Sequence, residues 1–253
     1  MTLLELIESS AQQLTDAKVS FGHGTTNAFD EAAWLVLYSL GLPLDTPLEG
    51  EGSEENRPLT PEQCAQAATL LGARISSRKP AAYLTHEAWL QGVPFYVDER
   101  VIVPRSLIAE LLVDGGMDYW LQENTHRVLD LCTGNGSLAI IAAMVFPEVV
   151  VDAADISQDA LDVARINLER HALTGRVTLV PSDGLAQVPG PYDLILCNPP
   201  YVNATSMAAL PAEYLAEPFI ALDGNQGGGQ DGMDFIRTLL QQAPAHMAPD
   251  AVL

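Results

Sequence analysis

The first part of the chain places apolar residues at helical spacing. One set recurs at intervals of three and four residues, which puts the side chains on one helical face: Leu3, Leu4, Leu6, Ile7 and Leu14. A second helix is expected over residues 30–38, where an acidic start precedes an apolar run. Thr60 is expected to cap a third helix to about Ser77, with Pro61 at its first position and Gln63 completing a capping box. Residues 1–79 are therefore predicted to form a helical domain.

Residues 80–104 contain short runs of apolar and aromatic residues that turn residues separate. The turns are expected at Gly92-Val93-Pro94 and at Asp98-Glu99-Arg100, and this pattern is typical of a hairpin. We expect the hairpin to link the helical domain to the rest of the chain. Pro104 is then expected to open a helix that runs to about Val113.

From about Thr125, apolar strands alternate with helices. Strands are expected over residues 128–132, 149–154, 177–180 and 192–197, helices over residues 137–145, 159–171 and 235–247, and the start of a fifth strand over residues 251–253. Such alternation is typical of a parallel sheet that helices cover on both faces. Residues 105–253 are therefore predicted to form a Rossmann-like α/β domain.

Charge and cysteine content restrict the classes of partner. The formal net charge of the 253 residues is −21, which opposes binding to a phosphate backbone, so no direct nucleic-acid binding is expected and a basic protein is favoured. The same charge is also typical of solubility alone. No apolar run is long enough to span a membrane, and the first residues do not form a signal peptide.

The three cysteines form no CxxC pair, which argues against a disulfide framework or a metal site. Cys132 and Cys197 are expected to be buried structural thiols in a cytoplasmic protein.

A glycine turn joins the first predicted strand of the α/β domain to a helix. Gly134 and Gly136 permit positive φ angles and close approach of the backbone to a ligand. The helix N-terminus supplies N–H donors. Asp155 ends the next strand about 20 residues later, where a carboxylate can accept ribose hydroxyls. Asp183 follows the third strand and is placed to accept a hydrogen bond from an adenine amino group.

The turn alone leaves the ligand open. Its spacing, Gly134-x-Gly136-x-x-Ala139, also satisfies the dinucleotide pattern of NAD, and such turns also occur without any ligand. Asp130 directly precedes the turn, where a carboxylate can receive the ammonium of a methionine moiety but would face a pyrophosphate poorly. Acids at three strand ends favour a cationic sulfonium nucleoside. The predicted S-adenosylmethionine site comprises Asp130, Thr133, Gly134, Asn135, Gly136, Asp155, Ile156, Asp183, Gly184 and Asn198.

The sequence Asn198-Pro199-Pro200-Tyr201 follows the fourth predicted strand. The side-chain carbonyl of Asn198 and the backbone carbonyl of Pro199 can accept both hydrogens of a planar NH2 group, which aims its lone pair at a sulfonium methyl. Tyr201 can stack on a flat amide or base. Asn198, Pro199 and Tyr201 are predicted to be catalytic, and Pro200 to bind the acceptor. A double proline after a strand is also common as a plain turn, and both glutamine and DNA bases carry such an NH2 group.

A third candidate is the segment Val103-Pro104-Arg105-Ser106. One interpretation is that it only ends the hairpin and caps the next helix. The other interpretation places it against the acceptor pocket, where Pro104 and Arg105 would bind the substrate.

The quoted motifs resemble those of the HemK-like protein-(glutamine-N5) methyltransferases over nearly the whole chain. Asp130 to Gly136 and Asn198 to Tyr201 are similar to the wider family. Phe21 to Thr25, Asn27 to Ala32 and Phe95 to Ser106 resemble the branch that acts on ribosomal protein L3. The release-factor branch usually has Pro-Arg-Pro-Glu-Thr-Glu where this chain has Pro-Arg-Ser-Leu-Ile-Ala.

The resemblance implies a class I methyltransferase that uses S-adenosylmethionine to methylate a glutamine side chain of L3. It also implies that residues 1–79 recognise the substrate. Alternatives are glutamine methylation of release factors, amino-methylation of DNA, and a donor-binding module without catalytic activity. The charge and the lack of a basic recognition segment argue against DNA.

Two features depart from the family pattern. The family's sheet has seven strands, so the C-terminal strands are expected to be missing here. Residues 217–232 are lengthened around residues 225–230 and contain Gly228-Gly229-Gln230, the tripeptide that release-factor enzymes methylate. We favour a chance occurrence in this loop over self-methylation.

Overall fold

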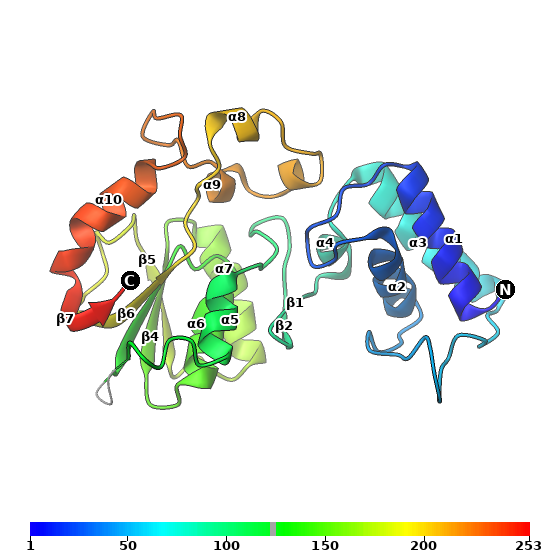
Figure 1. The fold of residues 1–253 in the computed structure, drawn as a ribbon, viewed down its shortest axis with the longest axis horizontal. Coiled ribbons are helices and arrows are strands. Elements are labelled where there is room, and N and C mark those ends of the chain that lie inside the picture. The colour runs from blue at the N-terminus through cyan, green and yellow to red at the C-terminus, as the bar shows by residue number, and fades with distance from the viewer. Residues whose placement is uncertain (122–124) are drawn as a thin grey trace. The chain divides into compact units, whose positions relative to one another are not determined.

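The computed structural model describes residues 1–121 and 125–253, which divide into two compact units. The helical unit contains Met1–His86 and Pro211–Ala216. The sheet unit contains Glu87–Leu210 and Glu217–Leu253. The chain therefore passes from the helical unit to the sheet unit, returns for six residues, and leaves again (Figure 1).

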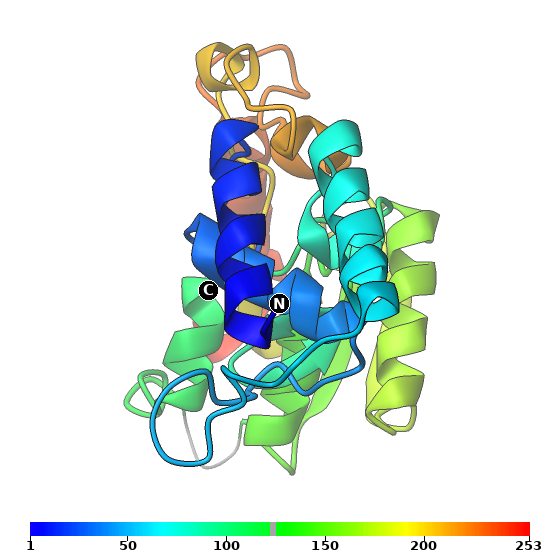
Figure 2. The same ribbon diagram turned by 90° about the vertical axis from the view of Figure 1, so that its right-hand side faces the viewer.

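The helical unit is built on α1, α2 and α3. Its elements are α1 (Leu3–Asp16), α2 (Ala28–Ser39), α3 (Pro61–Ser77), α4 (Ala81–Thr85) and the 3-10 helix η1 (Tyr214–Ala216). Helix α2 packs on both α1 and α3 (Figure 2). The capping box of Thr60 and Gln63 is present, as predicted. Asn27, rather than the acidic pair that follows it, caps α2 by accepting a hydrogen bond from the backbone N–H of Asp30.

The hairpin is shorter than the sequence predicted. Only β1 (Ala88–Leu90) and β2 (Val93–Phe95) pair, in antiparallel register. Residues 81–85, expected among the β-rich runs, form α4 instead. Ala81 and Ala82 favour a helix, and His86 ends it with a φ of 52°. Helix α5 (Leu107–Val113) begins after its N-cap Ser106, three residues later than expected.

The sheet unit contains a parallel sheet in the order β5-β4-β3-β6-β7. Its strands are β3 (Arg127–Leu131), β4 (Val150–Asp155), β5 (Val177–Pro181), β6 (Tyr192–Cys197) and β7 (Met247–Val252). The chain runs outward from β3 through β4 to β5 and then crosses back to β6. The strand order therefore reverses between β3 and β6, which is where α/β sheets bind ligands at their carboxyl ends.

Helices cover both faces of this sheet, which confirms the predicted Rossmann-like architecture. Helices α5, α6 (Ser137–Val145) and α7 (Gln158–Arg170) contribute to one core, and α10 (Asp234–Gln242) with the 3-10 helix η2 (Ala243–Ala245) contributes to the other. The sheet unit also contains the short helices α8 (Ala204–Met207) and α9 (Phe219–Leu222). Residues alternate along β3: Val128 packs in the core beneath α5 and α6, whereas Leu129 and Leu131 pack in the core beneath α10.

The C-terminal part differs from the prediction. Helix α10 ends at Gln242 rather than near residue 247, and β7 begins at Met247 rather than at residue 251. Pro244 explains the early end, because a proline has no N–H for the helical ladder. Pro249 within β7 is compatible with the position of this strand at the end of the sheet order. No helix in the described part of the chain is both long and apolar enough to cross a membrane.

Candidate active site

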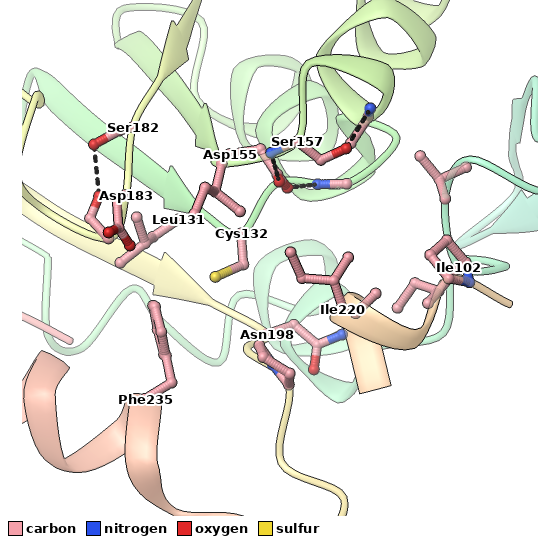
Figure 3. A pocket seen from close by; sticks show the side chains of 18 of the residues that line it. Ile102, Leu131, Cys132, Asp155, Ser157, Ser182, Asp183, Asn198, Ile220 and Phe235 are labelled. Carbon is pink, nitrogen blue, oxygen red and sulfur yellow. Dashed lines mark hydrogen bonds between the residues drawn. The ribbon is translucent and has the colours of Figure 1, made fainter. Parts of the chain in front are cut away.

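A cavity with about 770 Å³ of empty volume lies at the carboxyl ends of the sheet strands (Figure 3). Its lining includes six of the predicted donor-site residues: Gly134, Asp155, Ile156, Asp183, Gly184 and Asn198. Asp183, Leu131 and Phe235 gather on one side, and Asn198 and Ile220 lie on the other. The residues that the sequence places far apart are therefore brought together by the parallel order of the strands.

A smaller cavity with about 350 Å³ of empty volume also has Asn198 in its lining. Its lining includes six predicted residues: Pro104, Arg105, Thr133, Gly134, Asn135 and Asn198. Asn198 and Gly134 line both cavities. Asn198 thus lies where the two cavities meet.

The glycine turn is held open by left-handed backbone angles and by Asp155. Gly134 and Gly136 have φ angles of 56° and 81°, and a Cβ on Gly136 would lie 3.2 Å from the Cβ of Ala164. The Asp155 carboxylate accepts hydrogen bonds from the backbone N–H groups of Gly134 and Ser157, each at 2.9 Å. Burial raises the pKa of Asp155, although these N–H groups oppose that effect. Asp155 therefore fixes the turn against the end of β4.

Asp130 lies beneath the turn and lines neither cavity. Its side chain is buried, and its Oδ2 accepts hydrogen bonds from the Thr133 hydroxyl and from the backbone N–H of Ala139 at 3.0 Å. Its Oδ1 has no hydrogen-bond partner in the described part of the chain. Burial raises the pKa of Asp130 to about 7, against the opposing hydrogen bonds of Thr133 and Ala139. The geometry gives Asp130 the role of joining β3, the turn and α6.

Replacing Asp130 with asparagine is expected to flatten the dependence of the unfolding free energy on pH. An ordinary aspartate titrates at 3.8, so between about pH 4 and pH 7 the folded protein retains a proton that the unfolded chain has lost. The free energy of unfolding therefore falls as pH rises through this window. The difference between the two pKa values corresponds to a loss of roughly 4 kcal/mol across the whole window. Asparagine keeps an oxygen for Thr133 and Ala139 without the charge. Denaturant unfolding of both proteins at pH 5 and pH 7.5 measures the difference.

An equal pH dependence in the two proteins would contradict the raised pKa of Asp130. The contact between Asp130 and a donor ammonium stays a prediction, and the same variant addresses it. If Asp130 only holds the turn, the asparagine variant should bind the donor with nearly unchanged affinity. A large loss of donor affinity would support the ammonium contact.

The residues of the motif after β6 point to different places. Asn198 and Pro200 line the large cavity, whereas Pro199 lines an apolar groove beside Ile195 and Leu239. Tyr201 lines none of these cavities, and its side chain is 60% exposed. The next residue, Val202, forms an isolated bridge with Asp223, so the chain after the motif is tied to the end of α9.

Arg105 faces a carboxylate that the sequence did not single out. Its guanidinium donates two hydrogen bonds to the buried Glu217 carboxylate, each at 2.7 Å, and Glu217 also accepts from the backbone N–H of Val103 at 2.9 Å. This bidentate ion pair ties the segment after the hairpin to the start of α9. The sequence separation of 112 residues left no spacing pattern to reveal it.

Other lining residues were also missed. Phe235, near the start of α10, lines the large cavity, as do Pro218, Ile220 and Ala221 in and before α9. They come from loops and short helices whose direction no local pattern determines. The lengthened loop around residues 225–230 does contribute, because Gln226 lines the cavity, but Gln230 does not line it.

Cys132 and Cys197 are half-buried rather than buried as expected, and all three cysteines are free. Cys132 lines both cavities, and Cys197 lines the apolar groove. A hydrogen bond with Cys197 and burial raise the pKa of the Cys132 thiol well above its ordinary value. Cys132 therefore contributes a neutral thiol to the site.

Comparison with known proteins identifies relatives along the full length of the chain. Residues 111–219 match the family model of the methyltransferase small domain. The ribosomal protein uL3 glutamine methyltransferase of Bordetella pertussis is 48% identical over 255 residues, which cover 100% of this chain and 83% of the relative. The proteins of the same name from Burkholderia pseudomallei (48% identical, 82% of the relative covered) and Neisseria meningitidis serogroup A (44%, 81%) also match 100% of this chain.

The matches confirm the resemblance drawn from the motifs, and the sheet and its carboxyl-end cavity agree with it. The chain belongs to the ribosomal protein uL3 glutamine methyltransferase family.

Proposed function

We propose that this protein transfers a methyl group from S-adenosylmethionine to the side-chain amide nitrogen of a glutamine in ribosomal protein uL3. The observation that carries the proposal is that Asn198 lines both cavities, so a group bound by Asn198 can face a donor in the large cavity. The identity of the acceptor protein rests on the names of the relatives, which this chain matches over its whole length.

The lining of the large cavity fits the donor in its chemistry. The Asp155 oxygens accept the backbone N–H groups of Gly134 and Ser157 and have further lone pairs that can accept ribose hydroxyls. Asp183 can accept a hydrogen bond from the adenine amino group. The apolar side chains of Ile156 and Phe235 also line the cavity, where they can pack against the flat faces of the adenine ring. Thr133, Gly134, Asn135, Gly136 and Gly184 complete the proposed donor site, with Asp130 beneath it.

The chemistry asks little of the protein beyond placement. The bound donor supplies an electrophilic methyl group on a sulfonium. The Asn198 side-chain carbonyl and the Pro199 backbone carbonyl accept the two amide hydrogens and turn the nitrogen lone pair toward that methyl group. The nitrogen–carbon bond forms as the carbon–sulfur bond breaks, and the nitrogen then loses a proton to solvent. Pro200 and Tyr201 are proposed to contact the acceptor.

The segment around Arg105 is proposed to border the acceptor rather than the donor. Pro104 and Arg105 line the smaller cavity, and the ion pair with Glu217 holds the guanidinium in place.

Residues 1–79 are proposed to recognise the protein substrate and residues 80–104 to link the two domains. An acidic enzyme and a basic ribosomal protein attract each other. We propose the cytoplasm as the compartment, because its reducing conditions agree with three free cysteines.

The acceptor can be tested by incubating the protein with labelled donor and, in separate reactions, with uL3, a peptide release factor or duplex DNA. Label is expected on uL3 alone, and peptide mass spectrometry should place one added methyl group on a glutamine. Label only on the release factor or only on DNA would overturn the proposed acceptor. The same incubation without an acceptor tests for self-methylation of the Gly228-Gly229-Gln230 loop.

A further inference from the structure

The segment Pro211–Ala216, which we term the strap, belongs to the helical unit although both of its flanks belong to the sheet unit. The chain enters the strap after the Asn198 motif and α8. It leaves the strap at Glu217, directly before the α9 residues that form part of the donor cavity wall. The strap therefore lies between two parts of the proposed active site along the chain.

A buried carboxylate holds the strap within the helical unit. Glu213 is 0% exposed, and its Oε1 lies 2.8 Å from the Arg78 Nε and 3.5 Å from an Arg74 Nη. The same oxygen accepts a hydrogen bond from the backbone N–H of Ser20 at 3.1 Å. Burial would raise the pKa of Glu213, but backbone N–H groups, including that of Ser20, and then the two arginines lower it below its ordinary value. Glu213 is thus a charged anchor.

Arg74 joins this anchor to the core of the helical unit. It is itself 0% exposed, and its Nε donates to the buried carboxylate of Glu31 on α2 at 2.7 Å. Glu31, Arg74, Arg78 and Glu213 form a cluster of two negative and two positive charges. Three of the four side chains are buried, and Arg78 is partly exposed. Such a cluster adds little net stability, but removing one charge is costly, so it fixes a particular arrangement.

A second contact of the strap is aromatic. The rings of Tyr214 and His23 have centroids 4.3 Å apart, and His23 is buried. Gly22 has a φ of 128°, and a Cβ added there would lie 2.4 Å from the Tyr214 hydroxyl. The loop before α2 is therefore shaped to receive the strap.

The next carboxylate along the chain is anchored in the other unit. Glu217 lies four residues after Glu213 and pairs with Arg105 in the sheet unit. The two ends of residues 213–217 are therefore held by two separate ion-pair systems, one in each unit.

We propose that Glu213 is a positioning residue for methyl transfer. It fastens the loop between the Asn198 motif and the donor cavity wall to the helical unit, so the rate of transfer depends on the helical unit beyond substrate recognition. Glu217 and Arg105 hold the cavity wall independently, so donor binding does not depend on Glu213. This inference rests on the proposed function.

The test compares two buried carboxylates that share Arg74. Glu213→Ala releases the strap, whereas Glu31→Ala disrupts the same charge cluster from α2 and leaves the strap contacts of Arg78 and Ser20 in place. With uL3 and labelled donor, Glu213→Ala is expected to lower kcat by roughly tenfold or more, because small misplacements of reacting groups are costly. Glu31→Ala should lower kcat by less than about twofold at a similar loss of melting temperature. Donor affinity by calorimetry should stay unchanged in both.

Glu213→Gln keeps an oxygen acceptor for Arg78 and Ser20 and is expected to restore part of the lost kcat. Limited proteolysis with mass spectrometry gives a readout that needs no activity: cleavage within residues 208–216 should increase in Glu213→Ala but not in Glu31→Ala. If Glu213→Ala does not fold, Tyr214→Ala removes the aromatic contact and should change kcat and cleavage in the same direction.

The outcomes separate the two proposals. A wild-type protein that does not methylate uL3 refutes the proposed function, and the proteolysis result then still tests the anchor. A wild-type protein that methylates uL3, together with equal kcat losses in Glu213→Ala and Glu31→Ala, refutes the positioning role. Unchanged cleavage in the strap of a folded Glu213→Ala variant refutes the anchor.

Discussion

Replacing Asn198 with alanine is expected to lower kcat by roughly 10²–10³-fold, because placement of the acceptor nitrogen supplies most of what this site can contribute. The side-chain carbonyl is one of two acceptors that hold the amide hydrogens, and without it the lone pair of the nitrogen is no longer aimed at the methyl group. Donor affinity should change by less than about threefold, because Asp155 and Asp183 remain. Single-turnover methylation of uL3 and donor calorimetry measure the two quantities.

Asn203→Ala is the matched control for this prediction. Asn203 lies five positions after Asn198 in the same loop, and its side chain caps α8 by accepting a hydrogen bond from the Ser206 N–H. It lines none of the three cavities described above. A loss of kcat in the control equal to that in Asn198→Ala would show that the loop, rather than the Asn198 amide, limits transfer. A fully active Asn198→Ala variant would refute the catalytic role.

The strands, and the site residues at their carboxyl ends, could be predicted from local sequence. The strands β3, β4, β5 and β6 are apolar runs, and parallel strands bring their carboxyl ends to one edge of the sheet. The sequence therefore predicted that Asp155, Asp183 and Asn198 lie together, and all three line the large cavity. The L3 branch was predicted from longer motifs, and the relatives confirm that resemblance.

Contacts between distant segments could not be predicted in this way. Nothing local in Glu213 or Glu217 indicates a buried ion pair, because each is one of 33 acidic residues in the chain. The same limit applies to Asp130, which precedes the turn as expected but packs toward α6 rather than into the cavity. Its place depends on which face of β3 it occupies, and a strand buried on both faces gives no alternation to show that.

Replacing Asp155 with alanine is expected to weaken donor binding by roughly 10²–10⁴-fold, since hydrogen bonds to a charged acceptor contribute about 1.5–3 kcal/mol each and two ribose hydroxyls would lose their partner. The loss has a second cause, because the Gly134 N–H also loses its acceptor and the glycine turn is no longer tied to β4. Calorimetric titration with the donor or its demethylated product measures the affinity.

The pH dependence of wild-type donor binding provides an independent check on the same carboxylate. Burial raises the pKa of Asp155, so acidification protonates it earlier than an exposed aspartate, and affinity should fall as pH is lowered through that raised pKa. Asp155→Ala should lack this dependence. Asp159→Ala, which removes an exposed carboxylate from the first turn of α7, is the control and should bind the donor like the wild type. If Asp155→Ala bound the donor as tightly as this control, the ribose would have to be held elsewhere, and the cavity at the end of β4 would no longer support the donor site.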